Sequence, residues 1–302
     1  MSLNAVALNS DAWGVEDPVL SLLLREPLCV FEPAEGNCPF IFASPHSGRL
    51  YPESFLGASC LDGLALRRSE DAFVDELFAS APALGAIFLT ARFPRAYVDV
   101  NRAESEIDPS MFDGPLPLPV GARSARVSAG LGVIPKVVRD GVEIYRRRLP
   151  PREAAFRMEA FYRPYHAILA GLVRQAQARF GVAVVVDCHS MPPPSRGHDV
   201  VLGDCHGEAA APELSAYMQR ALAALGFSVG RNTPYAGGHT TSLYGKPASG
   251  VHVIQIEINR GLYLDERRME KTKGYAECEI RLARFVAELI SEPGPWRLPP
   301  RR

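Results

Sequence analysis

The stretch Val182-Ala-Val-Val-Val-Asp-Cys-His-Ser-Met-Pro192 (VAVVVDCHSMP) decides the fold. Its first seven residues are continuous, mostly apolar and rich in β-branched side chains, which is typical of a strand buried on both faces of a parallel sheet. Polar residues follow at the point where this strand ends. A strand covered on both faces needs helices above and below it, so the sequence predicts an α/β fold.

The rest of the chain alternates between predicted strands and predicted helices. Buried strands are predicted at 38–44 (CPFIFAS) and 251–258 (VHVIQIEI), with short strands at 86–90 and 97–100. Apolar residues at helical spacing predict helices at 19–24, from Ser69 as a cap through 78, at 165–180, at 214–225 and at 278–289. We therefore predict a three-layer α/β/α sandwich whose central sheet is mostly parallel or mixed.

The predicted domain organisation is simple. One domain is predicted over residues 36–292, preceded by an N-terminal extension (1–35) and followed by a loose Pro/Arg-rich tail (293–302). Neither an internal repeat nor an internal linker is recognisable in the sequence.

The composition excludes several classes of protein. The 302 residues carry 33 basic and 34 acidic side chains, a net charge of −1, which argues against nucleic acid as a partner. The sequence has no apolar run of about 18 residues that would span a membrane. Its six cysteines are scattered, and residues 1–16 lack the pattern of a secretory signal. These features predict a cytoplasmic protein with a small-molecule substrate, and they leave its oligomeric state undecided.

Polar side chains cluster at three strand ends. His46 follows the strand at 38–44, His189 ends the central strand, and Glu257 lies near the end of the strand at 251–258. Because the carboxyl ends of parallel strands share one edge of a sheet, these side chains should lie close together. Two imidazoles and one carboxylate form a frequent catalytic zinc site, with a water as fourth ligand. The carboxylate ligand is Glu70 or Asp71.

Each of these residues also has a structural interpretation. A histidine at a strand end is often only hydrogen-bonded, and acidic residues in a first helical turn are explained by the helix dipole. Glu257 is the natural general base, because alternation on a buried strand lets it face the site. Its structural interpretation is a salt bridge with Arg260 or Arg102, since a buried carboxylate is costly without a partner. Asp187, two residues before His189, is either an orienter of that histidine or a loop cap.

Basic and glycine-rich segments supply candidates for substrate binding. Residues 92–102 (RFPRAYVDVNR) carry three arginines, including Arg95 and Arg102, and arginine can grip a carboxylate with two hydrogen bonds. Residues 237–242 (GGHTTS) form a glycine-rich segment with His239. Other catalytic patterns fail: the chain has no G-x-S-x-G elbow, no Walker A motif and no H-E-x-x-H, and residues 130–135 only partly match a dinucleotide fingerprint.

At these residues the sequence resembles the N-formylglutamate amidohydrolase family. The matching blocks cover about residues 38–290 in order: SPHSGRLYP (44–52), EDAFVDELF (70–78), RFPRAYVDVNRAESEIDP (92–109), DCHSMP (187–192), and the run from GGHTTSLYG (237–245) to QIEINRGLYLDE (255–266). One departure is Ala72, at a position where family members commonly have Trp.

The resemblance implies a zinc-exopeptidase-like or phosphorylase/hydrolase-like fold. It also implies metal-dependent hydrolysis of N-formyl-L-glutamate to glutamate and formate, a step of histidine degradation, through a zinc-bound water. His46, Asp71 and His189 would hold one Zn²⁺, with another divalent metal as the alternative, and Glu257 would be the general base. The pair Asn101-Arg102 is similar to the Asn-Arg pair with which carboxypeptidases hold a substrate carboxylate. Further substrate-binding candidates are Arg95, His239 and Arg260.

Two other functions remain open from the sequence. One is a related metal amidase or carboxypeptidase that acts on another N-acyl amino acid or peptide, and the departure at Ala72 bears on this choice. The other is a binding protein that uses the basic stretch 139–152 to hold an acidic partner, although the near-zero net charge argues against it.

Overall fold

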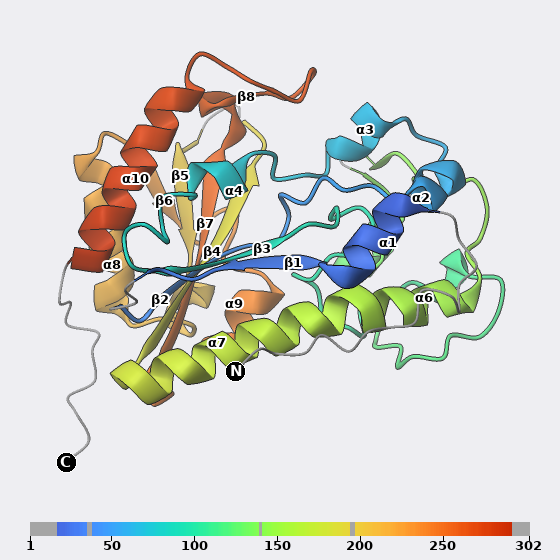
Figure 1. Cartoon of the computed structure of the whole chain (residues 1–302), viewed down its shortest axis with the longest axis horizontal. Helices are drawn as coiled ribbons and strands as arrows, with labels where there is room; N and C mark the ends of the chain where they lie inside the picture. Colours follow the sequence, from blue (N-terminus) through green and yellow to red (C-terminus); the bar gives the residue numbers. More distant parts are fainter. Residues whose placement is uncertain (1–16, 35–37, 139–140, 194–196, 292–302) are drawn as a thin grey trace. The chain divides into compact units, whose positions relative to one another are not determined.

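The computed structural model describes residues 17–34, 38–138, 141–193 and 197–291 (Figure 1). The predicted tail at 293–302 and the segment 1–16 lie outside the described residues. The chain divides into two compact units. Of the described residues, the first unit contains those within 17–29, 46–70 and 91–166, and the second contains those within 30–45, 71–90 and 167–291. The predicted division into one domain with an extension and a tail stays a prediction.

A seven-stranded sheet forms the centre of the second unit, with strand order β1-β3-β2-β4-β7-β5-β6. β2 pairs in parallel with β3 and β4, β4 with β7, and β5 with β6, whereas β5 runs antiparallel to β7. This mixed, mostly parallel sheet confirms the predicted fold class. The strands are β1 (Leu28–Phe31), β2 (Phe40–Ser44), β3 (Ile87–Ala91), β4 (Ala183–Met191), β5 (Val200–Gly203), β6 (Val229–Arg231) and β7 (Val251–Asn259), with a separate pair β8 (Leu264–Asp265) and β9 (Glu270–Lys271).

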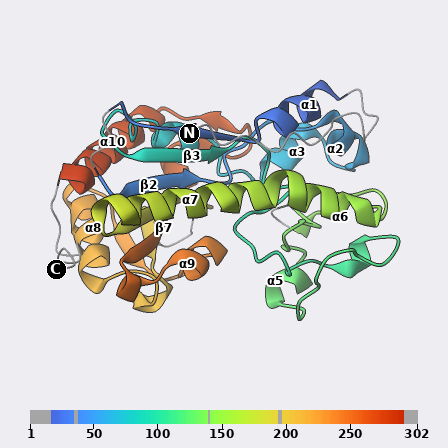
Figure 2. The ribbon, with the colours of Figure 1, turned by 60° about the horizontal axis from the view of Figure 1, so that its bottom comes forward.

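Helices cover both faces of this sheet. α4 (Val74–Leu77), α8 (Pro212–Ala224) and α10 (Tyr275–Ser291) pack on one face, where buried side chains such as Phe42, Val186 and Ile256 form the core. α7 (Arg163–Phe180) and the short α9 (His239–Tyr244) lie on the other face (Figures 1 and 2). The three predicted layers are therefore present. Among the described helices, none is long and apolar enough to cross a membrane.

Alternation along the central strands separates the core from the polar side chains. Val184, Val186 and Cys188 of β4 point into the core under α8 and α10. Asp187 and His189 point to the opposite face, because successive side chains of a strand alternate. In the parallel register, Asp187 pairs with Gln255 and His189 with Glu257. Four polar side chains therefore share one face near the carboxyl ends of β4 and β7.

The first unit is mostly helical and irregular. It contains α1 (Pro18–Arg25), α2 (Glu53–Ala58), α3 (Gly63–Arg67), α5 (Ala125–Ser128) and α6 (Pro151–Arg157), and a π-helical segment (Met158–Tyr162) joins α6 to α7. The buried Arg157 stabilises this unit. Its Nη1 donates to the Tyr97 carbonyl (3.0 Å) and to the Tyr145 hydroxyl (2.7 Å), and its guanidinium lies 4.0 Å from the centre of the Tyr97 ring.

The helix predicted from Ser69 through 78 is wrong in its length and cap. The Ser69 hydroxyl donates to the Leu66 carbonyl, and the φ angle of Phe73 is +63°, so α4 begins only at Val74. A left-handed residue cannot continue a right-handed helix. Glu70 and Asp71 consequently precede the helix, and the helix-dipole interpretation of these two carboxylates does not hold.

The short strand predicted at 97–100 is also wrong. These residues form consecutive turns, with the Tyr97 amide donating to the Pro94 carbonyl and the Arg102 amide to the Asp99 carbonyl. The side chain of Asp99 in this segment accepts hydrogen bonds from the Asn101 amide (2.9 Å) and from Arg95 Nε (3.0 Å). Local side-chain bonding of this kind competes with strand pairing.

Candidate metal and substrate site

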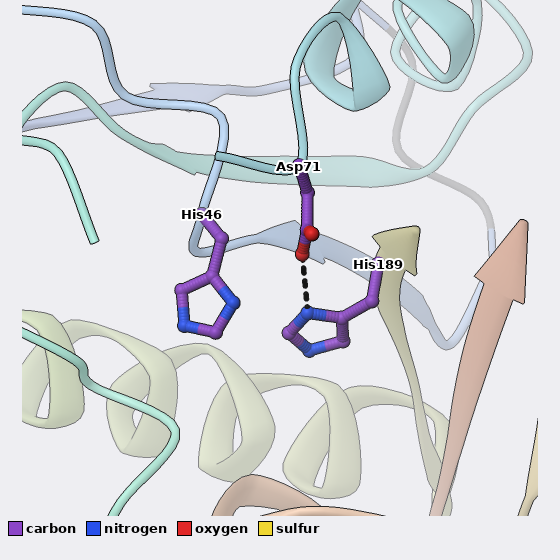
Figure 3. Close-up of side chains that lie close together, drawn as sticks. All are labelled: His46, Asp71 and His189. Carbon is purple, nitrogen blue, oxygen red and sulfur yellow. Dashed lines mark hydrogen bonds and ion pairs between the residues drawn. The ribbon is translucent and has the colours of Figure 1, made fainter. Parts of the chain in front are cut away.

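Three buried side chains form a group that could hold a metal ion. His46 directly follows the end of β2, Asp71 lies between α3 and α4, and His189 belongs to β4. All are at most 2% exposed, and one potential ligand atom from each lies within 4.8 Å of the others. Figure 3 shows the three side chains pointing toward one another. The three residues that the family resemblance implies as ligands are therefore brought together.

Both ring nitrogens of His189 face carboxylates. Nδ1 lies 2.9 Å from Oδ2 of Asp71, and Nε2 lies 3.0 Å from Oδ2 of Asp187. Burial alone lowers the pKa of His189, but the carboxylates of Asp187 and Asp71 outweigh it and raise that pKa well above its ordinary value. Without metal, the imidazole therefore carries protons on both nitrogens. A metal ion would replace the proton on Nδ1 and leave the bond to Asp187 in place.

His46 has a similar carboxylate behind it. Its Nε2 lies 2.8 Å from Oδ1 of Asp99. Burial acts to raise the pKa of Asp99, but the positive charges of Arg95 and Arg102 and the bond with His46 lower it well below its ordinary value. An ionised Asp99 requires Nε2–H as the donor, which makes Nδ1 the nitrogen that can coordinate a metal.

The donor set fits zinc. Zinc is commonly bound by imidazole nitrogens and carboxylate oxygens, and metal-binding histidines usually donate their other N–H to a carboxylate or carbonyl. Here Asp99 backs His46 and Asp187 backs His189. Of the two interpretations of Asp187, orientation of His189 agrees with this contact. The same nitrogen and oxygen donors would also accept other divalent metals.

Glu70, the alternative ligand, has other partners. Its carboxylate accepts a hydrogen bond from the Tyr51 hydroxyl (2.7 Å) and from Arg67 Nε (3.2 Å). Burial raises the pKa of Glu70. The group that could hold a metal contains Asp71 instead, and Ala72 beside it packs into the hydrophobic core.

Glu257 lies next to His189 in the sheet. The two residues are register partners on β7 and β4, and Glu257 is 7% exposed. Its Oε1 accepts a hydrogen bond of 2.7 Å from Nε2 of Gln255. Of the arginines considered as salt-bridge partners for Glu257, Arg260 pairs with Asp71 (2.9 Å) and Arg102 lies 3.8 Å from Asp99. Glu257 as the general base stays a prediction.

The candidates Arg95, Asn101 and Arg102 lie in one turn-rich segment of the first unit. Arg102 is held in place: its Nε donates to the Leu131 carbonyl (3.0 Å) and its Nη1 to the Asn101 carbonyl (2.9 Å). The Tyr162 hydroxyl donates to the Arg102 carbonyl (2.8 Å). Several bonds thus fix the orientation of this guanidinium. The roles of Arg95, Asn101 and Arg102 in substrate binding stay predictions.

Two further candidates, His239 and Arg260, lie in the second unit. His239 is the first residue of α9, which packs against β7. Arg260 donates through Nη2 to Asp71 Oδ1 (2.9 Å) and through Nε to the Ser190 hydroxyl (3.0 Å). The sequence did not single out Asp99 or Gln255 as members of the site. Spacing alone could have indicated Gln255, because it lies two residues before Glu257 on the same strand face.

Comparison with known proteins gives a consistent result. The family model for N-formylglutamate amidohydrolase matches residues 38–264. The chain is 30% identical over 246 residues to the N-formylglutamate deformylase of Pseudomonas aeruginosa, covering 77% of this chain and 84% of the relative. It is 27% identical over 245 residues to the N-formylglutamate deformylase of Pseudomonas putida, with the same coverage.

A solved structure is also similar to this chain. The crystal structure of N-formylglutamate amidohydrolase from Ralstonia eutropha superposes with a TM-score of 0.83 and 35% sequence identity, covering 87% of this chain and 97% of that chain.

Proposed function

The chain belongs to the N-formylglutamate amidohydrolase family, and on this premise we propose that it hydrolyses N-formyl-L-glutamate to L-glutamate and formate, a step of histidine degradation. One observation carries the proposal: the buried group of His46, Asp71 and His189, in which a carboxylate stands behind each imidazole. A zinc ion bound there would lower the pKa of a water molecule toward 7 and polarise the formyl carbonyl.

The chain's own residues would perform the proton transfers. Glu257, beside His189 in the sheet, accepts a proton from the attacking water and delivers it to the leaving nitrogen as the C–N bond breaks. The water oxygen ends in formate, and the nitrogen leaves as the primary amine of glutamate. Asp99 and Asp187 hold the two imidazoles in the required tautomers.

Arginines would select an acidic substrate. N-formylglutamate carries two carboxylates, and guanidinium groups bind carboxylates with strong charge-assisted hydrogen bonds. Arg102 with Asn101 and Arg95 is the principal candidate set, with His239 and Arg260 as further contacts. The restrained guanidinium of Arg102 supports this role, because a side chain already held by the Leu131 and Asn101 carbonyls loses little entropy on binding.

The reaction would take place in the cytoplasm. All six cysteines lie in the described part of the chain and none of them forms a disulfide, which agrees with a reducing compartment.

Metal content and formate release test the proposal together. The purified protein should contain about one zinc ion per chain and should release formate from N-formyl-L-glutamate. His46→Ala and His189→Ala should lose both properties, whereas His198→Ala, a change at an exposed histidine, should keep both. A protein that retains zinc and activity in both site variants would contradict the proposal.

A substrate panel tests the acyl group. Formyl, acetyl and succinyl derivatives of glutamate, compared by kcat/KM, should rank the formyl compound first. A higher kcat/KM for another acyl group would agree with metal amidohydrolase chemistry, but it would overturn N-formyl-L-glutamate as the substrate.

A further inference from the structure

Gln255 is a buried side chain beside Glu257 whose role the family resemblance does not supply. It is 5% exposed and lies two residues before Glu257 on β7, so both side chains point to the face of the sheet that also carries Asp187 and His189. Its Nε2 donates to Oε1 of Glu257 over 2.7 Å. An ionised carboxylate only accepts hydrogen bonds, and this fixes which end of the Gln255 amide faces Glu257.

The other end of this amide lacks a protein partner. Among the residues that the structure describes, none donates a hydrogen bond to the buried Oε1 of Gln255. A buried polar atom without a partner costs about 1–3 kcal/mol, so native proteins usually satisfy such atoms with protein, water or a ligand.

Backbone packs closely over the neighbouring strand. Gly203 of β5 is the antiparallel register partner of Gln255. A Cβ atom at Gly203 would lie 2.7 Å from the carbonyl carbon of Ala236 and 2.7 Å from the amide nitrogen of Gly237. The segment before α9 therefore covers this part of the sheet. Gln255 lies in the sheet between Asp187 of β4 and Gly203 of β5, its register partners on the two neighbouring strands.

We propose that Gln255 binds the N–H of the scissile amide through Oε1 while its Nε2 anchors the general base Glu257. This inference deepens the proposed function and rests on it. The leaving nitrogen then has two neighbours. The N–H of this nitrogen stays hydrogen-bonded to Oε1 of Gln255. The lone pair of the nitrogen, which forms as the carbonyl carbon becomes tetrahedral, is directed to the proton that Glu257 carries. No further reactant is needed, because that proton comes from the attacking water.

The proposal defines a substrate class. The site would favour secondary amides, which have one N–H, over esters that are otherwise identical. An ester oxygen offers no hydrogen to Oε1 and would leave it buried without a donor. A site built to bond an N–H discriminates against analogues that lack it.

The test compares an amide with its ester analogue in the zinc-loaded protein. The substrates are N-formyl-L-glutamate and the formyl ester of 2-hydroxyglutarate, with rates corrected for spontaneous hydrolysis. Gln255→Met removes both polar atoms at nearly constant shape. It should lower kcat/KM for both substrates, since Glu257 loses its anchor, and should lower the amide-to-ester ratio by a further factor of about ten.

Gln255→Glu is the second variant, because it keeps an acceptor oxygen at this position. Its amide-to-ester ratio should stay within about threefold of that of the wild-type protein even where both rates fall. The control is Gln177→Leu on α7, which removes a side chain that donates to the Ser249 carbonyl. It should leave both rates unchanged. Zinc content and thermal midpoint verify that each variant is folded.

The outcomes separate the two proposals. A wild-type protein that hydrolyses the amide, together with an unchanged ratio in Gln255→Met, would overturn the role of Gln255 alone. An equal fall of the ratio in Gln255→Glu and Gln255→Met would also overturn it, because the retained oxygen would then have no effect. A wild-type protein inactive on N-formyl-L-glutamate would overturn the proposed function, and the inference with it.

Discussion

Nε2 of His46 lies 2.8 Å from Oδ1 of Asp99, which is 53 residues further along the chain. Asp187 stands in the same relationship to His189, at 3.0 Å. Each of the two candidate histidine ligands is therefore oriented by a carboxylate whose charge increases the basicity of the ring.

Removing the charge behind His46 should weaken metal binding. Asp99→Asn retains an acceptor for Nε2 but loses the negative charge, and the zinc dissociation constant should rise about 10–100-fold. Competition with a chromophoric chelator measures this change. Asp113→Asn, at an exposed position, is the control and should leave the constant unchanged. Equal affinity in both variants would contradict the orienting role of Asp99.

Zinc binding should release a proton. The raised pKa of His189 means that Nδ1 is protonated in the metal-free protein at neutral pH, and a metal ion must displace this proton. Affinity should therefore increase with pH, by about tenfold per unit below that pKa. Calorimetric titrations in two buffers with different ionisation enthalpies count the protons. Heats that do not depend on the buffer would argue against coordination through Nδ1.

Arg102→Ala should raise KM for N-formyl-L-glutamate by about 10–100-fold, because a hydrogen bond to a charged group contributes about 1.5–3 kcal/mol. The change should be smaller for one of two analogues, N-formylglutamine or N-formylisoglutamine, each of which lacks one carboxylate. Arg163→Ala, at an exposed ion pair with Glu104, should leave KM unchanged. If neither analogue reduces the effect of Arg102→Ala, this residue does not bind a carboxylate.

Asp204 should stabilise the fold in a pH-dependent way. Its buried carboxylate accepts hydrogen bonds from the Ser215 hydroxyl (2.5 Å), Arg231 Nη2 (2.6 Å) and Asn232 Nδ2 (2.8 Å). Burial acts to raise the pKa of Asp204, but these bonds lower it below its ordinary value. A lowered pKa in the folded state stabilises the protein above the unfolded pKa, and this stabilisation is lost as the pH falls through the folded value.

Asp204→Asn should consequently reduce the free energy of unfolding by about 2–3 kcal/mol at pH 7. The reduction should become smaller as the pH falls below the ordinary carboxyl pKa, because the unfolded chain then binds a proton that the folded carboxylate does not. Urea denaturation at several pH values measures both effects, with Asp113→Asn as the control. A difference that is constant over this range would exclude a contribution from the ionised carboxylate.

The sequence predicts the sheet better than it predicts the loops. The central strands β4 and β7 are buried on both faces, so their apolar runs are recognisable without any tertiary information. The convergence of His46, His189 and Glu257 follows from the same property, because parallel strands end at one edge. The sequence predicts α4 too long, because the left-handed conformation of Phe73 delays the start of the helix to Val74. This conformation depends on tertiary surroundings that the sequence pattern does not reveal.

The carboxylates behind the histidines are harder to predict. Asp99 lies in a segment whose apolar residues suggested a strand, and its bond to His46 spans 53 residues without any local spacing signal. Gln255 carries no charge that would mark it as a site residue, and the sequence around it has the pattern of an ordinary buried strand. Such contacts depend on the register of strands and turns, which only the folded chain establishes.

Cys188 lies between Asp187 and His189 in sequence, yet it is fully buried in the core on the opposite face of β4. Burial, together with the nearby charge of Asp187, raises the pKa of its thiol well above the ordinary value. The nitrogen and oxygen donors of the candidate site are thus kept apart from the thiol of Cys188, so thiophilic ions such as Cd²⁺ and Hg²⁺ find no thiolate ligand from this strand. Alkylating reagents, which react with thiolates, should label the exposed Cys60 long before they reach the buried Cys188.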